Sequence, residues 1–88
     1  MDFRKKWVET GDFIIKEYKV ANYRAAIRFI DRIAELAMRE NHLPDILLHS
    51  TSRVKITLST KGAGQITELD YKLADSIDGI YHSSFSLV

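Results

Sequence analysis

The longest regular pattern in this sequence is an amphipathic segment that ends at the chain's only proline. Apolar side chains recur there at spacings of three and four, which places them on one face of a helix: Ala26, Phe29, Ile30, Ile33, Ala34, Leu36 and Ala37. Asn22 is a suitable N-cap. Pro44 forces Leu43 towards extended geometry, so the helix must end near His42. We therefore predict a helix from Asn22 to about Asn41, followed by a sharp corner.

Alternating patterns on both sides of this helix predict strands. Residues 13–20 begin with an apolar run and then alternate, with Tyr18 and Val20 facing in and Glu17 facing out. Residues 46–49 form a short second strand, and residues 50–52 a polar turn. Residues 53–60 alternate clearly, with Val54, Ile56 and Leu58 facing in and with Arg53, Lys55, Thr57 and Ser59 facing out. The last two strands therefore make a hairpin.

The remaining segments complete an α+β pattern. Residues 2–9 are a charged lead-in whose Trp7 is expected to close over the core edge, and residues 10–12 are a turn. Thr67 and Asp70 resemble a capping box. They open a helix with a predicted inner face of Leu69, Leu73, Ala74, Ile77 and Tyr81. The tail, residues 83–88, either docks on the body, docks on a partner or frays. Strand, helix, hairpin and helix in this order predict an antiparallel sheet with helices on one face.

Composition limits how such a fold is stabilised and what it binds. The 88 residues suffice for one domain, residues 1–88, with a single small core. There is no cysteine, so disulfides cannot stabilise the fold. Oligomerisation is the remaining common way for so small a domain to bury more surface, and we expect a homodimer or tetramer. A net charge of +1 gives no field that would attract nucleic acid or anionic lipid. With no apolar run of membrane-spanning or signal-peptide length, we expect a cytoplasmic protein.

His42 is the best candidate for chemistry. It follows a helix C-terminus, where the helix dipole favours the imidazolium form; from the residues alone, the favoured alternative is a structural role in which it satisfies the last carbonyls. The three histidines, with His42 and His49 seven positions apart and His82 distant, do not predict a metal site. The serines do not stand on a nucleophile elbow, and the glycines of residues 61–65 do not form a phosphate-binding loop. We predict no cofactor.

Several short motifs occur here in a characteristic order. They are Trp7, Tyr18-Lys19-Val20, Asn22-Tyr23, Ala34-Glu35, Glu40-Asn41-His42-x-Pro44-Asp45, Val54-Lys55-Ile56-Thr57-Leu58-Ser59-Thr60 and Ile66-Thr67-x-x-Asp70-x-x-Leu73-Ala74. Along nearly its whole length the chain resembles the pterin-4a-carbinolamine dehydratase family. The resemblance implies a four-stranded antiparallel sheet with helices on one face, assembled into dimers or tetramers. It also implies elimination of water from a 4a-hydroxytetrahydropterin, with one group protonating the departing hydroxyl and another taking a ring-nitrogen proton.

The chain departs from the family's active-site pattern. The family has a histidine pair before the proline, whereas Leu43 follows His42 here. It has a further histidine after the long strand, where this chain has Lys61, a poor base near pH 7 unless it is desolvated. A charged residue is replaced by Met38, and an aromatic residue expected near Thr51 is absent. Of the site, His42, Pro44 and Asp70 remain in place.

Two functions of different class follow from this resemblance. The helix from Ala21-Asn22-Tyr23 to Leu36 and the Pro44-Asp45 step are similar to those of non-catalytic dehydratase-like RuBisCO assembly factors of α-carboxysomes. This likeness implies a pseudoenzyme that binds a protein, with RuBisCO large subunit as the concrete partner. The alternative is a weak pterin dehydratase that binds a pterin and uses His42, supported by Lys61 and Asp70.

Overall fold

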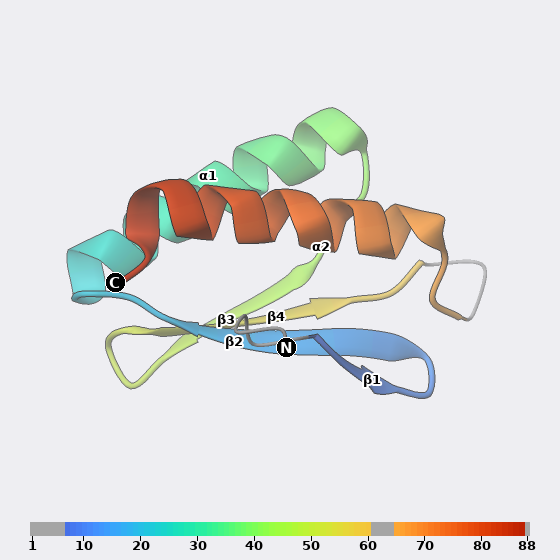
Figure 1. The fold of residues 1–88 in the computed structure, drawn as a ribbon, viewed down its shortest axis with the longest axis horizontal. Helices are drawn as coiled ribbons and strands as arrows, with labels where there is room; N and C mark the ends of the chain where they lie inside the picture. Colours follow the sequence, from blue (N-terminus) through green and yellow to red (C-terminus); the bar gives the residue numbers. More distant parts are fainter. Residues whose placement is uncertain (1–6, 61–64, 88) are drawn as a thin grey trace.

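The computed structural model describes residues 7–60 and 65–87 and shows two helices lying on one face of a single sheet (Figure 1). The elements in chain order are β1 (Val8–Thr10), β2 (Phe13–Lys19), α1 (Tyr23–Glu40), β3 (Asp45–His49), β4 (Arg53–Leu58), α2 (Glu68–Ile80) and the short π-helix η1 (Tyr81–Phe85). This two-layer arrangement confirms the predicted α+β class. None of the described helices is long and apolar enough to cross a membrane.

The four strands are all antiparallel and lie in the order β1-β2-β4-β3. Strand β1 was not predicted from the residue pattern, which gave a charged lead-in and a turn beginning at Thr10. Only the family resemblance implied a fourth strand. All three residues of β1 are exposed, so the strand lacks the alternation that marks a half-buried strand. Gly11, at φ 65°, makes the tight connection to β2.

Helix α1 begins and ends where its local sequence predicts. The side chain of Asn22 accepts a hydrogen bond from the Ala25 N–H and caps the first turn. At the other end Asn41 adopts the left-handed conformation, at φ 56°, and the His42 N–H donates to the Ala37 carbonyl at 3.0 Å. This is the hydrogen-bond pattern of a helix closed by a left-handed residue, and it turns the chain toward β3.

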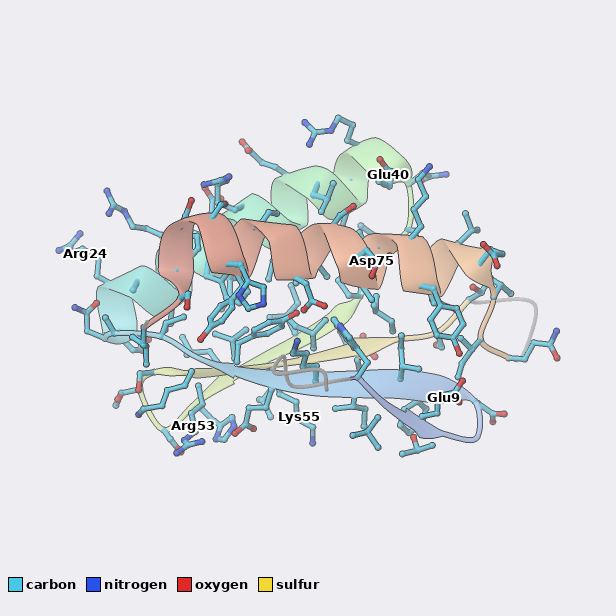
Figure 2. The ribbon with its side chains drawn as sticks, in the orientation of Figure 1. Glu9, Arg24, Glu40, Arg53, Lys55 and Asp75 are labelled. Atoms are coloured by element: carbon cyan, nitrogen blue, oxygen red, sulfur yellow. The ribbon has the colours of Figure 1, made fainter. Side chains whose placement is uncertain are left out.

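The core lies between the sheet and the two helices. In β4 the predicted inward residues Val54, Ile56 and Leu58 are all fully buried. Figure 2 shows Arg53 and Lys55 of the same strand on the opposite face, away from the helices. The predicted stripe of α1 is buried except at Ile30 and Ala34, which are only half-buried. Trp7 packs against the core edge, as predicted.

Helix α2 is held by an inner face that includes a charged side chain. The predicted capping box between Thr67 and Asp70 is present. Leu73, Ala74 and Ile77 are buried, as predicted. Leu69 was predicted on the inner face, but it is 53% exposed. Asp70 takes the inward place in the first turn, because its carboxylate is drawn in by buried donors.

The segment after α2 folds back onto the core. Phe85 packs on Phe29 with ring centroids 5.1 Å apart, and the Tyr81 hydroxyl donates to the Lys19 carbonyl at 2.8 Å. Tyr81 is only half-buried, so it belongs to the margin of the predicted inner face. Of the three predicted alternatives for the tail, docking on the body therefore applies to Phe85, whereas Leu87 is 51% exposed.

The β3–β4 turn contains an unusual backbone conformation. Ser50 and Thr51 have φ values of 52° and 63°. Two-residue hairpin turns with positive φ at both positions favour Asn-Gly, because a Cβ atom is strained there, most of all on a β-branched residue. The turn predicted from three polar residues is present, and it carries backbone strain.

Candidate functional site

The corner after α1 brings His42 onto the first turn of α2. The His42 Nε2 lies 2.6 Å from the Asp70 Oδ1, although the two residues are 28 positions apart. The Asp70 side chain is fully buried, and that of His42 is 11% exposed. Two of the predicted site residues are thus in direct contact, largely shielded from solvent. The third, Lys61, lies outside the described residues.

Asp70 is the centre of a buried hydrogen-bond network. Its Oδ2 accepts from the Thr60 hydroxyl at 2.8 Å and from the Thr67 N–H at 2.9 Å. The Thr67 hydroxyl lies 2.6 Å from that of Thr60. Burial raises the pKa of Asp70, but the Thr67 N–H, His42 and Thr60 together outweigh it and hold the pKa below its ordinary value. Asp70 is therefore a carboxylate near neutral pH.

This ionisation state decides which histidine atom is available for chemistry. A carboxylate only accepts hydrogen bonds, so the His42 Nε2 must carry the hydrogen that points to Asp70. Nδ1 is then the atom left for another molecule. Neutral His42 can take a proton there, and the imidazolium can donate one.

An open depression lies beside this pair. It has a volume of about 360 Å³ and is lined by Asn41, His42, Leu43, Ser59, Thr60 and Leu69. That size lies within the range of small-molecule pockets, roughly 300–1,000 Å³. Leu43 and Leu69 are 59% and 53% exposed, so two apolar side chains flank the depression. Among these lining residues, His42 is the one with an imidazole side chain.

The other two histidines lie elsewhere. The His49 Nε2 is 2.8 Å from Glu17 Oε1 on the sheet face that the helices leave uncovered, and Arg53 binds the second oxygen of that carboxylate at 3.2 Å. His82 is an exposed residue of η1. Within residues 7–60 and 65–87, no group of three or more His, Asp or Glu side chains is arranged to hold a metal ion.

Two features of the structure were missed by sequence reasoning. The first is that Thr60 joins the Asp70 network; it was missed because the sequence marked Thr60 only as the last residue of a predicted strand and of a family motif. The second is an ion pair at 2.8 Å between Lys16, which is 5% exposed, and the half-buried Asp78. Asp78 also accepts from the Tyr18 hydroxyl and from Trp7 Nε1. The alternation of β2 predicts an inward side chain at position 16, and this signal could have revealed the pair.

An aspartate therefore anchors helix α2 near each end, the buried Asp70 near its start and the half-buried Asp78 near its finish. Asp70 binds the corner after α1 and the end of β4, whereas Asp78 binds β2. Eight positions separate the two aspartates, so they lie near the same face of the helix as Ala74. The network at the first anchor contains the candidate site, and the second anchor lies about two helical turns away.

Sequence comparison places these residues in a family of known proteins. The family model described as pterin 4 alpha carbinolamine dehydratase matches residues 2–80. A protein of Thermomicrobium roseum named "Putative pterin-4-alpha-carbinolamine dehydratase" is 43% identical over 68 residues, which cover 77% of this chain and 72% of the relative. A protein of the same name from Chloroflexus aggregans is 41% identical over 78 residues, covering 88% of this chain and 82% of the relative.

Solved structures agree with this assignment. A transcriptional coactivator/pterin dehydratase from Brucella melitensis superposes with a TM-score of 0.76 at 28% identity, over 85% of this chain and 79% of that one. A pterin dehydratase-like protein identified as a RuBisCO assembly factor in the alpha-carboxysome superposes with a TM-score of 0.69 at 21% identity, over 85% of this chain and 86% of that one, and this likeness concerns the fold alone. From the matched residues, the relatives and the fold together, the chain belongs to the pterin-4a-carbinolamine dehydratase family.

Proposed function

We propose that this chain is a catalytically reduced member of the family that acts by binding another protein. One observation carries the proposal. Among the described residues that line the depression, His42 carries the one imidazole, and the neighbouring position holds Leu43, which is 59% exposed. Water elimination from a carbinolamine needs one group to protonate the departing hydroxyl and another to accept a ring proton. A leucine can do neither.

The apolar flanks of the depression support protein binding. Leu43 and Leu69 both line it and expose more than half of their surface. Exposed apolar side chains around a hollow are typical of contact surfaces, where a side chain of the partner fills the hollow. The buried Asp70 network keeps this corner rigid, because it ties the end of α1 to the start of α2.

RuBisCO large subunit is the partner to test first. The helix and Pro44-Asp45 features that resemble the assembly factors favour it, and an assembly factor of this kind shares the fold. RuBisCO subunits should be co-expressed with the wild-type chain and with Leu43→Asp/Leu69→Asp. The proposal expects a higher yield of assembled enzyme with the wild type, loss of that gain with the variant, and co-purification that depends on both leucines.

A control variant distinguishes loss of the contact surface from misfolding. Val8→Asp/Leu87→Asp replaces two other exposed apolar residues, which are 59% and 51% exposed and lie away from the depression. It should behave as the wild type does. If assembled RuBisCO is equal in the presence and absence of the wild-type chain, and nothing co-purifies, the proposed partner is wrong.

A residual pterin dehydratase is the second candidate, and one observation favours it. His42 and Asp70 are in contact at 2.6 Å, which leaves Nδ1 of an oriented imidazole beside a hollow of suitable size. One acid–base group contributes about 10²–10⁴ in rate. This candidate therefore predicts slow turnover that disappears in His42→Ala.

A further inference from the structure

A second hollow lies between α1 and η1, which Figure 1 shows in red at the end of the chain, folded back beside α1. It has a volume of about 390 Å³, which lies within the range of small-molecule pockets. Its lining residues are Arg28, Asp31, Arg32, Ser84 and Phe85. None of them lines the depression beside His42, and roughly 15 Å of helix separates Arg32 from that corner. This α1–η1 hollow is therefore distinct from the candidate functional site.

Arg28 and Arg32 supply two positive charges to the α1–η1 hollow. Residues four apart are neighbours on a helix surface, and like charges at this spacing destabilise a helix. No ion pair among the described residues uses either guanidinium. Both side chains are exposed, so both are available for charge-assisted hydrogen bonds to a ligand.

Ser84 and Phe85 bring η1 to the same hollow. The Ser86 N–H donates to the Tyr81 carbonyl at 2.8 Å, which is the i→i+5 hydrogen bond of a π-helix. Such turns are rare and occur frequently at functional sites. Phe85 is half-buried and packs on Phe29, with ring centroids 5.1 Å apart. The core thus fixes this wall of the hollow, and the exposed Ser84 beside it adds a hydroxyl donor.

The lining favours an organic phosphate over a bare anion. Guanidinium groups match phosphate oxygens, to which arginine commonly donates two parallel hydrogen bonds. The Asp31 carboxylate only accepts hydrogen bonds, so it repels an anion and binds a hydroxyl or amino group. Phe85 offers an aromatic ring for contact with a planar group. A nucleoside monophosphate has all three complementary parts, which are a phosphate, sugar hydroxyls and an aromatic base.

We propose that the α1–η1 hollow binds a nucleoside monophosphate. The phosphate accepts hydrogen bonds from Arg28, Arg32 and the Ser84 hydroxyl. A sugar hydroxyl donates to Asp31, and the base contacts Phe85. This site goes beyond the proposed function, because it shares no residue with the depression, and either site can be lost without the other.

Titrations followed by the amide chemical shifts of isotope-labelled protein at low ionic strength test the class of ligand. The probes are AMP, ribose 5-phosphate, adenosine and inorganic phosphate. We expect AMP to bind about 10-fold or more tightly than each of the others, because each of them lacks the base, the phosphate or the nucleoside. The amides that shift should include Arg28, Arg32 and Ser84, whereas the amide of His42 should not move.

Two double variants test the location of the site. Arg28→Gln/Arg32→Gln removes both guanidiniums and should weaken AMP binding by about 10-fold or more, as for loss of hydrogen bonds to a charged group. Arg24→Gln/Arg39→Gln removes the same charge from α1 outside the hollow and should bind AMP as the wild type does. Circular dichroism should show that both variants are folded.

Three results would overturn the proposal. The first is the absence of saturable shifts with AMP at millimolar concentration. The second is that inorganic phosphate binds as tightly as AMP, which would indicate attraction of any anion. The third is that the two folded double variants weaken AMP binding equally, because the effect would then reflect the charge of the helix rather than the hollow.

Discussion

Asp70 is the residue whose replacement should cost this fold most, and Asp70→Asn isolates its charge. The carboxylate is fully buried and accepts hydrogen bonds from His42, Thr60 and the Thr67 N–H. Asparagine keeps the size of the side chain. It turns one acceptor into a donor, which either faces the Thr67 N–H or forces His42 to accept at Nε2 and so lose its charged form.

The magnitude follows from burial. Removing one partner of a buried charged pair typically costs about 3–5 kcal/mol. Weakening the helix cap accounts for roughly 1 kcal/mol of such a loss. Small domains unfold with about 5–15 kcal/mol in total, so the variant should lose a third or more of a stability near the lower end of that range. At about 4–8 °C per kcal/mol, the melting temperature should fall by at least ~12 °C.

Urea unfolding at pH 7 gives this free energy directly, and Asp75→Asn is the matched control. Asp75 lies on the exposed side of the same helix (Figure 2), so its replacement should stay within about 0.5 kcal/mol of wild type. The low pKa of folded Asp70 adds a pH dependence. The stability that the Asp70 carboxylate gives the fold is complete above the ordinary aspartate pKa of 3.8 and is lost as the pH falls through the lower pKa of the folded state. The gap between wild type and Asp70→Asn should therefore narrow in acid. Equal stability of the Asp70 and Asp75 variants at pH 7 would refute the reasoning.

Three further predictions concern parts of the fold outside the site. Lys16→Met should lower the free energy of unfolding by about 3 kcal/mol, because Asp78 loses its buried cation; a change below 0.5 kcal/mol in urea unfolding would contradict this ~3 kcal/mol estimate. Ser50→Asn/Thr51→Gly should raise stability by about 1–2 kcal/mol, because it relieves two left-handed residues, and a lower melting temperature would count against strain in this turn. Burial, and then the Asp78 carboxylate, raise the pKa of Tyr18, so its phenol should stay protonated in the folded protein. An alkaline absorbance titration should therefore give the same phenolate signal for the wild type and for Tyr18→Phe, and a smaller signal for the variant would contradict this.

The segments that sequence reasoning predicted well are those in which local chemistry and burial agree. Helix α1 combines an N-cap at Asn22, an apolar stripe and a following proline, and its observed bounds differ little from the prediction. The capping box of α2 was also predicted, because Thr67 and Asp70 lie within one turn and each side chain accepts a hydrogen bond from the backbone at that turn. Such signals need no knowledge of the rest of the chain.

The features that were missed or wrong depend on contacts distant in sequence. Strand β1 is short and exposed, and it exists because it pairs with β2. Lys16 is buried because Asp78, 62 positions away, neutralises it. Leu69 was assigned to the core by its apolar character, but Asp70 takes the inward position because His42 and Thr60 supply buried donors.

In the candidate site, too, the residues could be predicted from the sequence, but their contact could not. His42 was identified from the helix end and the proline, and Asp70 through the family resemblance; the structure places the two in contact. The contact of His42 Nε2 with Asp70 could not be predicted from spacing, because it depends on how α2 meets the corner after α1.

Dehydration of freshly generated 4a-hydroxytetrahydropterin tests the central claim most directly. The rate should be measured with no protein, with the wild type and with His42→Ala, at equal concentrations and at several protein concentrations. A catalytically reduced, protein-binding member predicts that the wild-type rate stays close to the spontaneous rate and to that with His42→Ala, because Leu43 cannot supply the second proton-transfer group that water elimination needs. Turnover that rises in proportion to wild-type protein, well above the spontaneous rate, and that is abolished in folded His42→Ala would contradict it.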